Sequence, residues 1–170
     1  MRAPLFFIIM RYIIGIGNYW MYDDSIGLRI IEHIAENDLL KDFDQVEAID
    51  LSANVLNIFS YLTETSEKII IVDTARMGKA PGEYVFFSPE DVATEKKLQN
   101  FSTHEGDILK VLELAKGTNY KIPEIEFMGI EPELIKSDCG LSETLKIKIH
   151  DYSIAVLSRL SLSPRPHISQ

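Results

Sequence analysis

The feature that most constrains the fold is an apolar run, Ile69-Ile70-Ile71-Val72, that lies between Lys68 and Asp73. A continuous β-branched run of this length is typical of a strand buried on both faces of a parallel sheet. Residues 6–16 have the same character, and Gly15 and Gly17 end that segment. We therefore expect a sheet that helices cover on both sides.

Segments with helical periodicity alternate with the expected strands. Ile26 to Ile34 has apolar residues at helical spacing, and either Asp23 or Asp24 is a natural N-cap for that helix. The other expected elements are strands at 46–51, 83–87 and 125–130, and helices at 53–62, 102–116 and 141–160. The turn at 79–82 is too short for a crossover helix, so the strand at 83–87 is expected to be antiparallel. The prediction is a three-layer α/β/α sandwich with a mixed, mostly parallel five-stranded sheet.

Length and composition indicate one globular domain over residues 1–170. Residues 1–9 are expected to be an N-terminal extension or a longer first strand, and residues 163–170 a frayed tail. The net charge of −9 disfavours nucleic acid and suits cations or a basic partner. Cys139 is the single cysteine, which excludes an internal disulfide and is typical of a cytoplasmic protein. The apolar stretch at 5–17 contains Arg11 and is too short to span a bilayer, so no membrane insertion is expected.

Three acidic residues and one histidine are expected at the same edge of the sheet. In open α/β sheets, ligand sites form outside the carboxyl ends of the parallel strands. Asp24, Asp50 and Asp73 follow or end the first three strands, and His104 begins a helix. A helix N-terminus disfavours imidazolium, and neutral imidazole is the form that binds metal. Asp24, Asp73 and His104 would be a usable ligand set for zinc, iron or nickel. Taken singly, each also has an ordinary reading as a cap, a turn former or a solvated residue.

Other site chemistries find less support. Gly15 and Gly17 match the first two glycines of a dinucleotide fingerprint, and Asp50 stands where a ribose-binding acid would, but Trp20 occupies the third glycine position. A Gly-Lys-Ser/Thr phosphate loop is missing, and so is a serine between glycines at a strand–helix elbow. Cys139 has no neighbouring histidine in the sequence, so a nucleophilic role is disfavoured.

Six short motifs, in order along the chain, resemble those of the hydrogenase maturation endopeptidases. They are Gly15-Ile16-Gly17-Asn18, Asp23-Asp24-Ser25-Ile26-Gly27, Ile71-Val72-Asp73 with Lys79-Ala80-Pro81-Gly82, Ser102-Thr103-His104, Gly129-Ile130-Glu131-Pro132-Glu133, and Gly140-Leu141-Ser142. The resemblance covers residues 10 to about 160. One departure concerns the turn after the second strand, where many relatives have glycine and this chain reads Asp50-Leu51-Ser52-Ala53-Asn54. That departure bears on which precursor is recognised and on whether this chain is proteolytic.

The resemblance implies a metal-dependent protease that removes a C-terminal peptide from a nickel-loaded precursor of a nickel–iron hydrogenase large subunit. The family's metal-binding residues fall on Asp24, Asp73 and His104. The metal would be nickel carried by the substrate or another divalent ion, and no nucleotide is implied. It would either promote hydrolysis as a Lewis acid or report metal occupancy while the residues position the chain. The rival reading is a non-proteolytic α/β module of the same fold that binds the precursor or a nucleotide.

Overall fold

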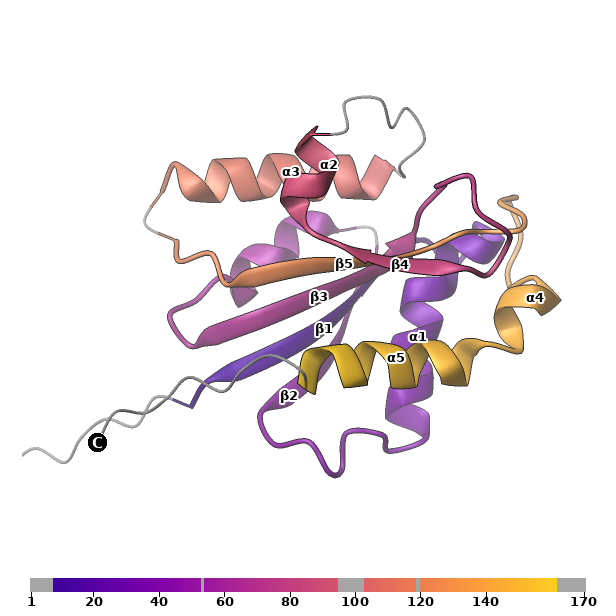
Figure 1. The fold of residues 1–170 in the computed structure, drawn as a ribbon, viewed down its shortest axis with the longest axis horizontal. Helices are drawn as coiled ribbons and strands as arrows, with labels where there is room; N and C mark the ends of the chain where they lie inside the picture. The colour runs from indigo at the N-terminus through magenta and orange to yellow at the C-terminus, as the bar shows by residue number, and fades with distance from the viewer. Residues whose placement is uncertain (1–7, 53, 95–102, 119, 162–170) are drawn as a thin grey trace, which may run out of the picture.

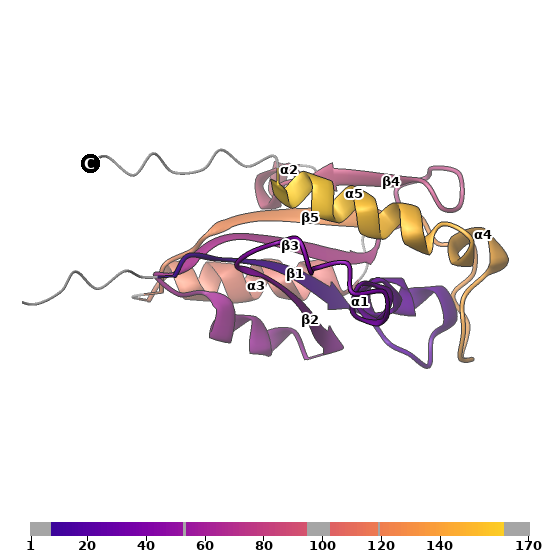
Figure 2. The same ribbon diagram turned by 90° about the horizontal axis from the view of Figure 1, so that it is seen from below.

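The structure is a computed structural model that describes residues 8–52, 54–94, 103–118 and 120–161, with the backbone alone at 92–94 and 103–106. Its centre is a five-stranded sheet with helices on both faces (Figures 1 and 2). The strands are β1 Met10–Ile16, β2 Val46–Ser52, β3 Ser66–Thr74, β4 Tyr84–Phe87 and β5 Glu124–Ile130. The α-helices are α1 Ile26–Glu36, α2 Pro89–Thr94, α3 Thr103–Lys116, α4 Glu143–Lys146 and α5 Ile149–Ser161. Two 3₁₀ helices, η1 Tyr22–Ser25 and η2 Val55–Tyr61, complete the described elements.

The strand order is β2-β1-β3-β5-β4, and β4 alone among these five runs antiparallel to its neighbour. The predicted mixed, mostly parallel sheet is therefore confirmed. The strand β3 lies at its centre, between β1 and β5, and is buried over nearly its whole length. Its neighbours run in the same direction, so the carboxyl ends of β1, β2, β3 and β5 all reach one edge of the sheet, on the right in Figure 1.

Each face of the sheet has its own apolar core, as the three-layer prediction requires. On one face, α1 and α5 pack over Ile13, Ile70 and Met128. On the other, η2 and α3 pack over Ile14 and Ile71. Adjacent residues of one strand thus belong to opposite cores, because successive side chains of a strand point to opposite faces. This double burial explains why the strand sequences are apolar without alternation.

Three segments differ from the prediction. The first strand begins at Met10 rather than Phe6; Ile8 and Ile9 precede it, and residues 1–7 lie outside the described residues. Residues 55–61 form a 3₁₀ helix rather than part of an α-helix. The C-terminal segment is two helices, because the chain turns at 147–148, where the amide of Lys148 bonds the Leu145 carbonyl three residues back. The apolar spacing continues across this turn, so periodicity alone did not reveal it.

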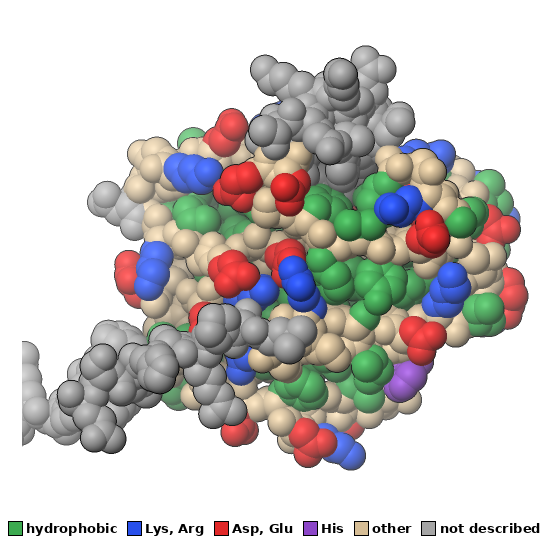
Figure 3. All heavy atoms as spheres, in the orientation of Figure 1, with side chains coloured by type: hydrophobic (Ala, Val, Ile, Leu, Met, Phe, Trp, Pro, Cys, Tyr) green, Lys and Arg blue, Asp and Glu red, His purple; other side chains and the backbone are tan. Residues whose placement is uncertain are grey.

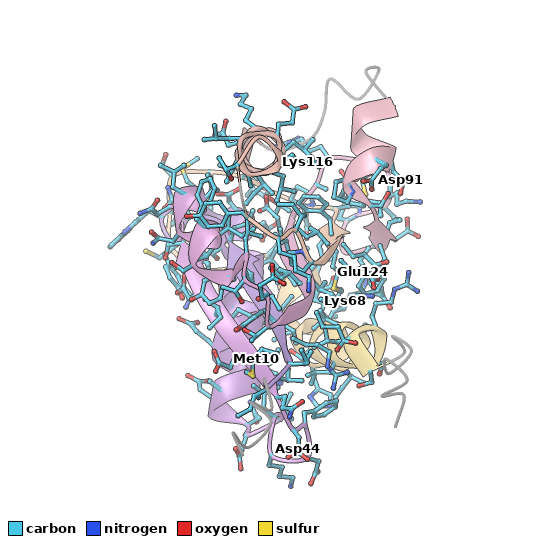
Figure 4. The ribbon with its side chains drawn as sticks, turned by 90° about the vertical axis from the view of Figure 1, so that its left-hand side faces the viewer. Met10, Asp44, Lys68, Asp91, Lys116 and Glu124 are labelled. Atoms are coloured by element: carbon cyan, nitrogen blue, oxygen red, sulfur yellow. The ribbon has the colours of Figure 1, made fainter. Side chains whose placement is uncertain are left out.

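The amino edge of the sheet carries a partly buried charge cluster. Figure 4 shows Lys68 and Glu124 side by side at this edge, with their charged atoms 2.8 Å apart. The Lys68 ammonium also lies 3.2 Å from Glu126, which in turn accepts a hydrogen bond from Arg159. Burial alone would raise the pKa of Glu126, but Arg159 and Lys68 outweigh it and hold that pKa below its usual value. This cluster ties α5 to β5 at the end of the sheet opposite the candidate site.

The C-terminus of α1 contains a strained residue, Asp38, which supports a stability prediction. Asp38 has φ 51°, and the amides of Asp38 and Leu39 bond the carbonyls of Ala35 and Ile34. This is a Schellman cap, whose left-handed position favours glycine. The carboxylate also faces the negative end of the helix dipole. We expect Asp38→Gly to raise the free energy of unfolding by about 1 kcal/mol.

Thermal unfolding measures this effect, which corresponds to a rise in Tm of roughly 2–4 °C for a chain of this size. Asp44 is the matched control, because it is an exposed loop acid that does not have a positive φ. Asp44→Gly is expected to leave Tm unchanged or lower it. A Tm for Asp38→Gly at or below that of the wild type would contradict the interpretation.

Candidate functional site

Close packing of α1 on the sheet positions the first acidic residue. A Cβ at Gly27 would lie 2.2 Å from the Val72 carbonyl oxygen, so only glycine allows α1 to approach β3 this closely. Gly17 has φ 141°, and a Cβ there would lie 2.0 Å from the Asp24 carbonyl oxygen. The glycines therefore have a packing role: they bring the backbone of Asp24 against the ends of β1 and β3.

Asp24 and Asp73 converge on one hydroxyl. The Thr74 Oγ1 lies 3.1 Å from Asp24 Oδ1 and 3.5 Å from Asp73 Oδ1. The Thr74 amide also donates to Asp73 Oδ1 at 2.8 Å. Asp73 and Thr74 are each 1% exposed, whereas Asp24 is half-buried. Two carboxylates from distant parts of the chain thus share one hydroxyl at the carboxyl end of β3.

The third residue, His104, is the second residue of α3. Figure 1 shows α3 running opposite to the parallel strands, so its first turn lies toward the carboxyl edge of the sheet. The side chain of His104 and the expected cap Ser102 lie outside the described residues. The convergence of Asp24, Asp73 and His104 therefore stays a prediction. Among the side chains that are described, no group of three histidine, cysteine or acidic residues is arranged to hold a metal ion.

The N-cap prediction for α1 was wrong for both acids. Ser25 is the N-cap residue, and α1 has no side-chain cap hydrogen bond. Asp23 is fully buried and accepts three backbone amides from another loop, those of Glu133, Leu134 and Ser142. The 3₁₀ turn η1 precedes α1 and directs Asp23 toward the loop after β5, so the carboxylate is used there.

Glu131 makes a similar connection on the other side of the site. It is 8% exposed, and its Oε2 accepts the amides of Met77 and Lys79 at 2.6 and 3.1 Å. It thereby fixes the loop that follows Asp73. Sequence analysis missed both structural carboxylates and Thr74. The sequence shows only that Asp23, Glu131 and Thr74 lie in or beside the short motifs. That position does not identify a bonding partner 50 or more residues away in the chain.

Asp50 stabilises the turn that follows it. Its Oδ1 accepts the amide and hydroxyl of Ser52 at 2.7 and 2.8 Å, and its Oδ2 accepts the hydroxyl of Tyr19 at 3.0 Å. Burial, together with Glu32 and Asp50, raises the pKa of Tyr19, which keeps the phenol a donor. Ser52 has φ 50°, a conformation that favours glycine. The turn after β2 is therefore left-handed at Ser52, and bonds to the Asp50 side chain stabilise it.

Two pockets lie away from the acidic pair. One, of about 410 Å³, is lined by residues of α2, α3 and the start of β5. The other, of about 500 Å³, is lined by residues near β4 and α5, including Tyr84 and Tyr152. Neither includes Asp24 or Asp73. Asp73 is buried and Asp24 is half-buried, so the pair reaches the surface through Asp24.

The fold is an α/β sandwich with two carboxylates at the carboxyl edge of its sheet, which is typical of an α/β enzyme. Comparison with known proteins identifies the family. The sequence profile of the hydrogenase maturation protease family matches residues 28–159. This chain therefore belongs to the hydrogenase maturation protease family. It is an endopeptidase of the hydrolase class.

Individual relatives agree with this assignment. The chain is 24% identical over 148 residues to the hydrogenase 2 maturation protease of Escherichia coli, covering 87% of this chain and 88% of that protein. The hydrogenase maturating endopeptidase HybD from E. coli has a similar fold, with a TM-score of 0.73 at 24% identity and coverage of 90% and 93%. HybD from Thermococcus kodakarensis gives a TM-score of 0.74 at 23% identity, with coverage of 89% and 99%. At these identities, the solved structures support the fold alone.

Proposed function

We propose that this protease removes a C-terminal peptide from a hydrogenase large-subunit precursor that already carries nickel, and that Asp24, Asp73 and His104 contact that metal. The observation that carries the proposal is the shared position of the two carboxylates at Thr74, on the edge toward which α3 begins. Carboxylates and imidazole together are a suitable donor set for nickel, zinc or iron. Another divalent ion remains the alternative occupant.

Two roles for the trio are consistent with these contacts. In one, the metal that the substrate brings supplies Lewis acidity at the scissile carbonyl or at a water molecule. In the other, the residues detect metal occupancy, and cleavage follows from positioning of the chain. Both roles require Asp24 and Asp73 to reach the same ion, so the same substitutions test them.

We further propose that the chain acts in the cytoplasm on a protein partner and has no nucleic-acid ligand. Support comes from the net charge of −9 and the single exposed cysteine. On the face in Figure 3, basic side chains are interspersed with acidic ones rather than gathered into a stripe. Within the described ranges, no helix is both long and apolar enough to cross a membrane.

The test is cleavage of purified nickel-loaded precursor, compared with nickel-free precursor, followed by mass spectrometry of the released peptide. We expect His104→Ala and Asp24→Asn each to reduce the cleavage rate by about 100-fold or more, since loss of even a supporting residue at a metal site costs 10- to 100-fold. His150→Ala is the matched control, because His150 is an exposed histidine on α5. Equal processing by wild type and His104→Ala would remove His104 from the site. Binding of the precursor without cleavage by any form would favour the binding-module reading.

A further inference from the structure

Two large apolar side chains project into solvent from the loops beside Asp24. Trp20, in the loop after β1, is 70% exposed, and Leu134, in the loop after β5, is 46% exposed. Trp20 is the single tryptophan of the chain. Tryptophan is highly buried on average in folded proteins, so such an exposed position is informative. The two loops lie together at the right-hand end of the molecule in Figures 1 and 2.

The backbone of both residues is held rigidly although their side chains are exposed. The Trp20 amide donates to Asn18 Oδ1 at 2.9 Å, and the Trp20 carbonyl accepts the Asp138 amide at 3.0 Å. Leu134 donates its amide to the buried carboxylate of Asp23 at 2.8 Å, and its carbonyl accepts the Asp23 amide. Binding of a partner to these side chains would therefore require little further ordering of the backbone of this chain, so its entropic cost would be small.

Trp20 and Leu134 are both connected to the segment that carries Asp24: Trp20 precedes it in the chain, and the backbone of Leu134 bonds Asp23. Asp23, which fixes Leu134, immediately precedes Asp24, and Trp20 is four residues before Asp24. Lys136 is the cation on the same loop, but it already pairs with Asp138 at 2.9 Å and lies over the Tyr22 ring. The cation of this loop is thus already engaged, Glu133 beside Leu134 is an exposed acid, and Trp20 and Leu134 offer apolar contact.

We propose that Trp20 and Leu134 form the docking surface for the precursor segment next to the scissile bond, and that this segment presents apolar side chains. The proposal rests on the proposed function, which places the precursor at this edge. It extends that function by assigning substrate recognition to residues outside the metal-contacting trio. Exposed tryptophans in rigid surroundings are frequent sources of binding energy in protein–protein contacts.

The first test separates binding from cleavage. We expect Trp20→Ala to raise KM for nickel-loaded precursor about 30-fold and Leu134→Ala about 5-fold, while kcat stays within about 2-fold. Leu114→Ala is the matched control, since Leu114 is 61% exposed on α3. Trp20→Phe is expected to recover most of the affinity. The loss should be similar at low and high salt, because the contact is apolar. Wild-type KM for Trp20→Ala would overturn the proposal.

A second measurement does not depend on cleavage. Protease grown with 5-fluorotryptophan carries one fluorine label, at Trp20, whose ¹⁹F resonance reports its surroundings. Unlabelled nickel-loaded precursor is expected to shift this resonance for the wild type and for Asp24→Asn alike. A shift with Asp24→Asn but without cleavage supports both the docking surface and the site. A bound precursor that leaves the resonance unchanged would overturn the docking surface, whatever happens to cleavage.

Discussion

Asp23→Ala is expected to lower the free energy of unfolding by about 4 kcal/mol, the largest single effect on stability that we anticipate. Asp23 is fully buried, and its carboxylate accepts the amides of Ser142, Glu133 and Leu134 at 2.7, 3.0 and 2.8 Å. Hydrogen bonds to a charged group are stronger than neutral ones, and each buried amide left without an acceptor costs about 1–3 kcal/mol. The substitution leaves one buried amide, that of Ser142, and two partly buried amides, those of Glu133 and Leu134, without their acceptor.

Urea denaturation followed by circular dichroism measures this loss, and Tm is expected to fall by roughly 10 °C. The adjacent acid provides the matched control. Asp24 is half-buried and accepts the Thr74 hydroxyl, so Asp24→Ala should cost no more than about 1 kcal/mol while abolishing cleavage. Two neighbouring carboxylates would thus separate into a structural and a functional one. If Asp23→Ala unfolded within 1 kcal/mol of the wild type, the structural assignment would fail.

Thr74→Val is expected to reduce cleavage by about 10- to 100-fold, with a loss of stability near 1 kcal/mol. Valine matches threonine in shape but lacks the hydroxyl that lies between Asp24 and Asp73. The Thr74 amide still bonds Asp73 at 2.8 Å in the variant, whereas Asp24 loses the 3.1 Å bond from the hydroxyl, so the larger change is at Asp24. Thr74 is therefore a positioning residue that acts through Asp24.

Steady-state kinetics on nickel-loaded precursor check this effect, and the loss is expected mainly in kcat because docking at Trp20 is untouched. Thr74→Ser restores a hydroxyl and should recover most of the rate. Thr63→Val is a control, since its hydroxyl bonds the hydroxyls of Thr65 and Ser66, at the amino end of β3. Full activity in Thr74→Val would show that Asp24 is held without the hydroxyl.

Local sequence indicated one of the acidic residues at the carboxyl edge of the sheet but not the roles of two others. The acid at the end of β3 was recognisable, because an apolar strand that ends in a carboxylate is a local pattern. The structural role of Asp23 was not, because it depends on the loop after β5, which is more than 100 residues away in the chain. The same holds for Glu131, whose acceptor role depends on the loop at 75–82.

The sequence by itself determined the layered sheet, the antiparallel β4 and the edge at which the acids lie, because periodicity and short connections act over neighbouring residues. Tertiary structure alone decided that Thr74 joins Asp24 to Asp73, that Asp23 anchors a distant loop, and that the C-terminal segment turns between α4 and α5. These features depend on which donors and acceptors meet once the two cores have formed. A buried carboxylate takes whatever amides lie beside it, and the sequence does not state which those are.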